Sequence, residues 1–115
     1  IDDKDPSPFD LFELEKIIGK QGPEIIRELL TDFWQAAMVD KKRIRSALDS
    51  KNRSELIQAT HAAKEAAKSS GAIILSELLS ELHQACAKGK WSSLEVSFEK
   101  VCWEYEQVEH YIIRL

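Results

Sequence analysis

The chain has 115 residues, of which 43% are hydrophobic and 31% are charged, and its net charge is −4. This size fits one domain, and the mixture of apolar and charged residues indicates a globular chain rather than a disordered one. The acidic balance argues against a nucleic-acid partner, and no apolar run approaches the roughly 20 residues that a membrane helix needs, so we expect no membrane contact by this domain.

The opening stretch, IDDKDPSP, is acidic and polar, unlike the basic and then apolar start of a secretory signal peptide, so we expect it not to be one. Because the chain also begins without Met, we interpret it as a piece of a longer protein or as a processed chain. Residues 1–7 would be the remnant of a linker, and residues 8–115 a helical bundle domain. Asp10, with Glu13 three residues later, predicts the capping box of a short first helix. The apolar positions of that helix are Leu11, Leu14, Ile17 and Ile18.

Two longer helices are predicted next. Pro23 occupies a favoured first-turn position, and the second helix should run from about 23 to 49. Its apolar positions at helical spacing are Ile26, Leu30, Phe33, Ala37, Ile44 and Leu48, and Ile25, Leu29 and Trp34 widen the stripe. Asn52 followed by Glu55 starts the third helix. The inner face of that helix is narrow and mostly small: Leu56, Ala59, Thr60, Ala63, Ala67 and Ser70.

Two further helices complete the chain. The fourth should end at Gly89, and its apolar positions are Ile74, Leu75, Leu78, Leu79, Leu82 and Cys86. Ser92 with Glu95 opens the fifth, whose buried side is Leu94, Phe98, Val101, Cys102, Tyr105, Val108 and Ile112. The chain has no proline after Pro23 and no hairpin signal, which favours long helices. The predicted fold class is therefore all-α, an antiparallel four-helix bundle with a short additional N-terminal helix.

The two cysteines, Cys86 and Cys102, are too few for a typical disulfide-stapled secreted domain of this size. They do not form a CxxC pair, so we expect no structural zinc site. Buried free thiols in a reducing cytosol are the simplest interpretation, and we expect a cytoplasmic domain.

A helical wheel of the third helix, at about 100° per residue, separates its inner face from a polar outer face. The outer face holds Ile57, His61, Lys64, Glu65 and Lys68. An ordinary surface histidine is one interpretation of His61. The exposed Ile57, one turn earlier, would suit a docking surface, although single exposed apolar residues are common.

The stretch HAAKEAAKSSGA, residues 61–72, resembles the signature of histidine-containing phosphotransfer (Hpt) domains. That signature runs His, two residues, Lys, Gly, and then small residues to a Gly-Ala pair. The residues at matching spacings are His61, Lys64, Ser69, Gly71 and Ala72. The resemblance covers essentially the whole chain, because a short first helix precedes four bundle helices and the histidine lies midway along the second of those four.

The resemblance implies a phosphorelay carrier in two-component signalling, a phosphotransfer intermediate rather than an autonomous enzyme. His61 would accept a phosphoryl group from the aspartate of a receiver domain and pass it to another receiver. Lys64 would stabilise the phosphate, with Lys68 adding a weaker field, although either lysine would be unremarkable without the motif. The position of the family's orienting residue, often Gln, falls on His83 with Gln84 adjacent. A plain surface histidine is the competing interpretation of His83.

The implied partners are response-regulator receiver domains and a histidine kinase, in cis or in trans. The Hpt-like chain would hold no cofactor or metal of its own, and Mg²⁺ would be supplied by the receiver. The context expected from the linker-like N-terminus is the C-terminal module of a hybrid sensor kinase, in which case the domain is tethered to a membrane sensor.

Glu65 departs from the family pattern, which has Gly directly after the lysine. Its carboxylate would place negative charge beside an incoming phosphoryl group, while favouring the helix by up to about 1 kcal/mol over Gly. A tolerated variant, a deliberate substitution and a binding module impaired in phosphotransfer all remain open. A metal site on His61 and Glu65 is the least favoured alternative, because the sequence offers no clear third ligand.

Overall fold

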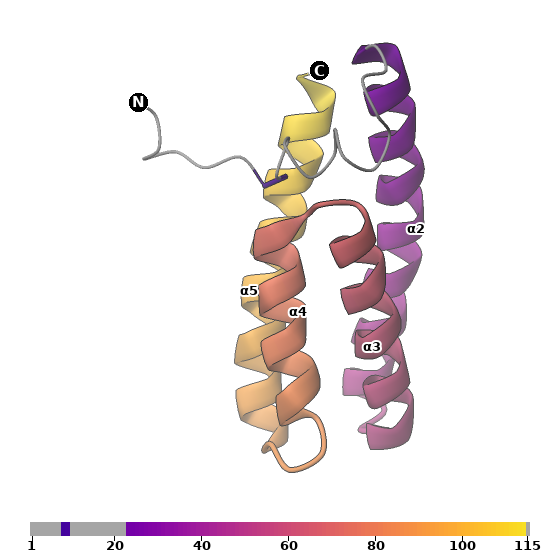
Figure 1. Cartoon of the computed structure of the whole chain (residues 1–115). Coiled ribbons are helices and arrows are strands. Elements are labelled where there is room, and N and C mark those ends of the chain that lie inside the picture. Colours follow the sequence, from indigo (N-terminus) through magenta and orange to yellow (C-terminus); the bar gives the residue numbers. More distant parts are fainter. Residues whose placement is uncertain (1–7, 10–22, 115) are drawn as a thin grey trace.

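The computed structural model describes residues 8–9 and 23–114. The linker predicted at 1–7 and the first helix predicted after Asp10 lie outside the described residues. The described chain forms an antiparallel bundle of four helices, labelled as in Figure 1. The fold class predicted from the sequence is therefore confirmed. The helices are α2 (Pro23–Asp49), α3 (Arg53–Ser69), α4 (Ile73–Ala85) and α5 (Trp91–Ile113).

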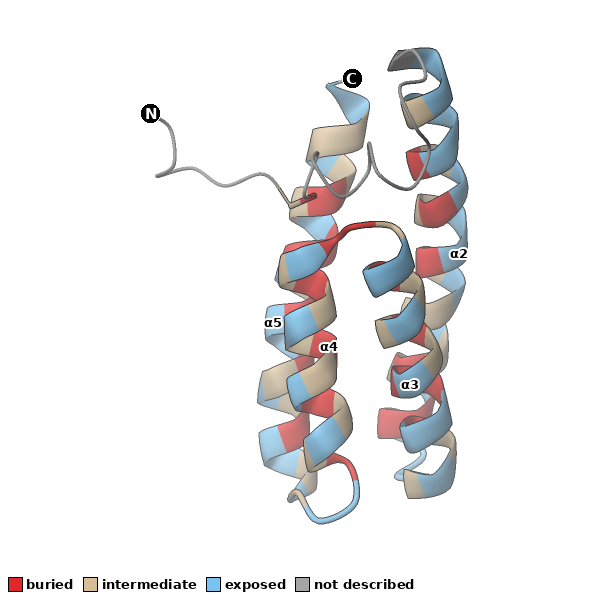
Figure 2. Cartoon of the chain, viewed as in Figure 1, coloured by how far each residue is buried: buried red, intermediate tan, exposed pale blue. Residues whose placement is uncertain are grey.

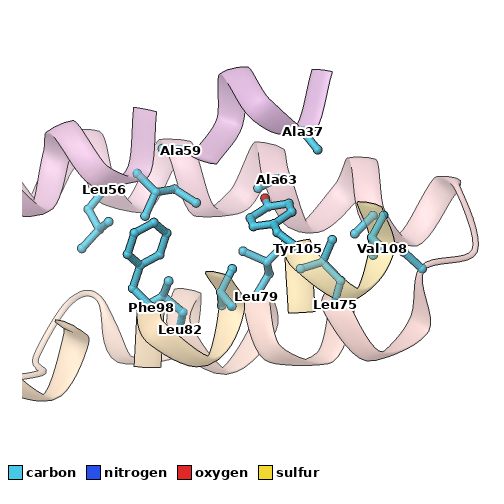
Figure 3. Close-up of a cluster of buried hydrophobic side chains, with 14 of the residues drawn as sticks. Ala37, Leu56, Ala59, Ala63, Leu75, Leu79, Leu82, Phe98, Tyr105 and Val108 are labelled. Carbon is cyan, nitrogen blue, oxygen red and sulfur yellow. The ribbon is translucent and has the colours of Figure 1, made fainter. Parts of the chain in front are cut away.

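Each helix packs against the two that neighbour it around the bundle, and α5 closes the ring against α2. The buried positions form inward-facing stripes along all four helices (Figure 2). Aliphatic and aromatic side chains from α4 and α5 fill the centre, and the small residues of α3 lie against them (Figure 3). Such close packing lets the α3 backbone approach its neighbours, as the narrow face of that helix predicted.

The ends of α3 follow from local chemistry. The side chain of Asn52 accepts a hydrogen bond from the backbone N–H of Glu55 at 3.1 Å, which confirms the predicted N-cap. At the other end, Gly71 adopts a φ of 76°, which lets the Ala72 N–H reach the carbonyl of Ala67 at 2.9 Å. This Schellman arrangement ends α3 and turns the chain directly into α4.

The boundary between α4 and α5 differs from the prediction. The fourth helix ends at Ala85 rather than Gly89, and the N–H of Gly89 closes a turn back onto the Ala85 carbonyl at 2.7 Å. The fifth helix begins at Trp91 without a side-chain cap, so the predicted Ser92–Glu95 capping box is absent. The helix starts two residues earlier than the predicted box, with Lys90 as its N-cap, so Ser92 lies inside the first turn, and Glu95 forms an ion pair with Arg45 of α2.

Several predicted core positions are also more open than expected, and those that are only half-buried include Ile26, Trp34, Ile74, Leu78 and Ile112. Ile25 and Leu29 are each 40% exposed, so the apolar stripe of α2 is narrower at its start than the sequence suggested. Cys86 is buried as predicted, but Cys102 is only half-buried because it lies at the edge between α2 and α5. A helical wheel gives the direction of each side chain around its own helix. It does not show how far along that helix the neighbouring helix remains in contact.

The long helices α2 and α5 continue beyond the turn that joins α3 to α4 (Figure 1). Phe9 packs between them at this end, with its ring centroid 6.0 Å from that of Phe33 and 5.4 Å from that of Tyr111. The aromatic contact covers apolar surface that the shorter helices leave open. Within the described residues, every helix is too short or too polar to cross a bilayer.

Candidate functional site

His61 lies midway along α3 with its side chain exposed to solvent. The opposite side of the helix is buried, as the wheel predicted, through Leu56, Ala59, Thr60, Ala63 and Ala67, whereas Ser70 is only half-buried at the C-cap. Since this inner face anchors α3 against its neighbours, the helix holds His61 outward on a rigid support. An exposed imidazole on such a support is accessible to a partner protein.

His83 lies beside His61, although the two residues belong to different helices. The ring centroids are 5.6 Å apart, and the rings are tilted at 47° to each other. His83 is half-buried between α3 and α4, and its Nδ1 lies 2.9 Å from the hydroxyl oxygen of Thr60. The structure therefore brings together the two histidines that the resemblance paired, and it adds a buried threonine behind them.

The surroundings of His83 favour its neutral form. Burial lowers the pKa of this imidazole, and the positive charge of Lys64 and the proximity of His61 lower it further. A hydrogen bond with the backbone of Ile57 acts in the opposite direction and is the weakest of these influences. When His83 is neutral, the ammonium group of Lys64 has no competing positive charge from the His83 ring.

Lys64 occupies a more enclosed position than the wheel predicts, because only 23% of its side chain is exposed. Its Nζ lies 4.0 Å from a carboxylate oxygen of Glu65, whose own side chain is 53% exposed. Within the described part of the chain, Glu65 has Lys64 at ion-pair distance and neither His61 nor Lys68. The acidic side chain that departs from the family pattern thus contacts the lysine expected to stabilise the phosphate.

The remaining predicted binding residues surround this centre. Ile57 is 36% exposed, and Lys68 and Gln84 are exposed. A cavity of about 760 Å³ lies elsewhere, between α2 and α5, and includes Met38, Lys41, Arg45 and Phe98 in its lining. Among the described residues, no group of three metal-binding side chains comes together. His61 therefore belongs to an open surface, which suits contact with a macromolecule better than enclosure of a small substrate.

Comparison with known protein families adds an independent observation. The family model for the Hpt domain matches residues 28–115, well over half of the chain. The chain belongs to the Hpt-domain family. Hpt domains are phosphorelay carriers in two-component signalling, and they interact with receiver domains and kinases. Searches of curated proteins and of solved structures gave no significant match.

The sequence did not indicate that the hydroxyl group of Thr60 lies beside the two histidines. Thr60 was assigned to the core by its position on the wheel, and it is indeed fully buried, but its hydroxyl contacts His83. The signal available in the sequence was weak. A hydroxyl on a buried helix face needs a polar partner, and a carbonyl of its own helix is the usual one. Only the position of α4 relative to α3 reveals the second partner.

Proposed function

We propose that this Hpt domain carries a phosphoryl group on His61, receiving it from the phosphoaspartate of one receiver domain and passing it to the aspartate of another. The observation that carries the proposal is the exposed His61 at the centre of α3, with Lys64 and His83 beside it. A neutral imidazole is a good nucleophile near pH 7, since the unperturbed pKa of histidine lies close to that value.

The proposed step conserves all atoms of the phosphoryl group. The lone pair of a His61 ring nitrogen attacks phosphorus as the bond from phosphorus to the aspartate oxygen breaks, and the aspartate leaves as a carboxylate. The resulting phosphoimidazolium releases its remaining ring proton to solvent. Lys64 stabilises the negative charge of the phosphoryl oxygens through its ammonium group. His83 orients the His61 ring from α4, in the position of the family's polar residue.

The partner completes the reaction. A receiver domain supplies Mg²⁺ and most of the electrostatic stabilisation of the transferring group, and the Hpt domain contributes the acceptor and a docking surface. Ile57, Lys68 and Gln84 lie exposed around His61 and form the rim that a receiver would cover. We infer a cytoplasmic site of action, and a histidine kinase, in the same chain or in another, as the source of phosphate.

A second candidate function is receiver or kinase binding without efficient transfer. The contact between Glu65 and Lys64 favours it, because the carboxylate competes with phosphate for the ammonium group and adds negative charge at the site. Both functions use the same surface. They differ in whether a covalent phosphohistidine forms at a useful rate.

Incubation with a receiver domain carrying a ³²P-labelled phosphoaspartate tests the proposal. We expect an acid-labile, alkali-stable label on the wild-type chain and no label on a His61→Gln variant. A His110→Gln variant is the matched control, since His110 is an exposed histidine of α5. Absence of label on the wild type across a panel of receivers, with binding retained, would favour the binding module. Label that survives His61→Gln would refute the assignment of the acceptor.

A further inference from the structure

The hydroxyl of Thr60 has several neighbours and a single proton to share among them. Its oxygen lies 2.8 Å from the carbonyl oxygen of Leu56, 3.2 Å from that of Ile57 and 2.9 Å from Nδ1 of His83. The sulfur of Cys86 is more distant, at 3.6 Å, and its own S–H donates to the Leu82 carbonyl. Since Thr60 is fully buried, water does not relieve any mismatch in this cluster.

The two carbonyls decide where the proton lies. A carbonyl oxygen only accepts hydrogen bonds, so a contact of 2.8 Å between two oxygens requires the Thr60 proton to lie between them. If the proton pointed to His83 instead, oxygen lone pairs would face each other at that distance. With the proton donated to the α3 backbone, the Thr60 oxygen can only accept from His83, and Nδ1 must carry hydrogen.

A second observation agrees with this assignment. The backbone of Ile57, one turn before His61, raises the pKa of the His83 imidazole, against the effect of burial. That direction is expected when a ring N–H points at a carbonyl. The side of His83 that faces α3 is therefore its donor side, and a neutral His83 retains only Nε2 as an acceptor.

We propose that Thr60 is a positioning residue, which fixes His83 as the Nδ1–H tautomer so that Nε2 of His83 accepts a hydrogen bond from the His61 ring. The His61 side chain is exposed and free to turn, and its ring centroid is 5.6 Å from that of His83, so a modest rotation allows an N–H···N bond. Once one nitrogen of His61 donates to His83, the nucleophilic lone pair is confined to the other nitrogen.

This inference deepens the proposed phosphotransfer function and rests on it for its kinetic consequence. It also explains how a histidine can replace an orienting glutamine. An amide side chain always has its donor on nitrogen and its acceptor on oxygen. In a neutral imidazole either ring nitrogen can carry the hydrogen, and the surroundings decide which one does. Thr60 places the hydrogen on Nδ1 of His83, and we therefore expect Thr60 to affect the transfer rate only when position 83 is histidine.

The experiment combines a tautomer measurement with transfer kinetics. Long-range ¹H–¹⁵N NMR correlations of labelled wild-type protein should show neutral His83 as the Nδ1–H tautomer. Thr60→Val removes the hydroxyl at nearly constant size and should yield a tautomer mixture, while Thr60→Ser should preserve the wild-type signature. With a ³²P-labelled receiver, Thr60→Val should slow transfer about three- to tenfold, the effect of about one hydrogen bond, and Thr60→Ser should restore the rate.

Two further variants separate positioning from simple destabilisation. Val108→Ala removes buried methyl groups from α5 and serves as the control for destabilisation without loss of a polar group. In a His83→Gln background, Thr60→Val should no longer slow transfer. An Nε2–H tautomer in the wild type, equal slowing by Val and Ser, or an undiminished effect in the Gln background would each overturn the proposal. If no receiver labels the wild type, the proposed function fails, and the NMR measurement still decides the tautomer.

Discussion

Replacing Glu65 tests whether its carboxylate lowers the phosphorylation of His61 by electrostatic repulsion. Side chains four residues apart on a helix have Cβ atoms about 5–6 Å apart, so Glu65 lies close to a phosphoryl group on His61. Two unit charges about 6 Å apart in water repel each other by roughly 0.7 kcal/mol, and the phosphoryl group carries a charge of about −1.5 to −2. The repulsion between Glu65 and the phosphoryl group is therefore about 1.0–1.4 kcal/mol in water, and screening at physiological salt reduces it by about half. The net penalty is about 0.5–0.7 kcal/mol.

This magnitude predicts a measurable but moderate gain. Glu65→Gln removes the charge while keeping the shape, and should raise the equilibrium fraction of phosphorylated domain about two- to threefold. The released Lys64 becomes fully available to the phosphate, because its ammonium group no longer has a carboxylate oxygen at 4.0 Å. Glu65→Gly also opens space for the receiver, but it costs the helix up to about 1 kcal/mol, or roughly 5 °C in Tm.

The assay is the partition of ³²P between a receiver and each variant at equilibrium, measured at low salt and again near 1 M salt. The Debye length falls to about 3 Å at 1 M, so the difference between wild type and Glu65→Gln should largely disappear there. Equal labelling of the wild type and Glu65→Gln at low salt would refute the electrostatic reasoning. A gain confined to Glu65→Gly would assign the restraint to size rather than charge.

Three other substitutions give separable outcomes. Lys64→Gln should reduce the labelled fraction with little effect on Tm, and an unchanged fraction would remove Lys64 from the site. Burial raises the pKa of Glu104, whose Oε2 has no partner within the described chain, so its ionisation weakens the fold as pH rises above the usual carboxyl value of 4.5. Glu104→Gln should therefore raise the urea-unfolding free energy at pH 8 by on the order of 1 kcal/mol and by less at pH 5, and a gain independent of pH would contradict this. Gly89→Ala should cost about 1–3 kcal/mol in the same assay, because the new Cβ would lie 2.7 Å from the Ala85 carbonyl oxygen, and wild-type stability would show that the turn adapts.

The sequence was sufficient for features that depend on a single helix. The start of α3 at Asn52, both ends of α2 and the small inner face of α3 follow from capping chemistry and periodicity. The exposed position of His61 follows from the same wheel. Each of these depends on neighbours within about four residues along the chain.

Features that depend on two helices were not accessible in this way. Glu95 was assigned to a capping box, and it pairs with Arg45 because α2 lies beside α5. Lys64 was placed on the outer face, yet only 23% of its side chain is exposed, and its charge lowers the pKa of His83 on α4. The hydrogen bond from His83 to Thr60 joins residues 23 positions apart, so no local pattern encodes it. The resemblance indicated that His61 and His83 lie together, but not which of their ring nitrogens donate and which accept hydrogen bonds.

The inner face of α3 also constrains how such domains diversify. Ala59, Ala63 and Ala67 are buried and small, so the distance between the backbones that carry His61 and His83 is set by how closely their two helices approach. A larger residue on the inner face of α3 would push the neighbouring helix away, whereas substitutions on the outer face would not change the distance between the helices. Partner preference can therefore change through substitutions on the exposed rim, while the spacing of the two helices that carry the histidines stays the same.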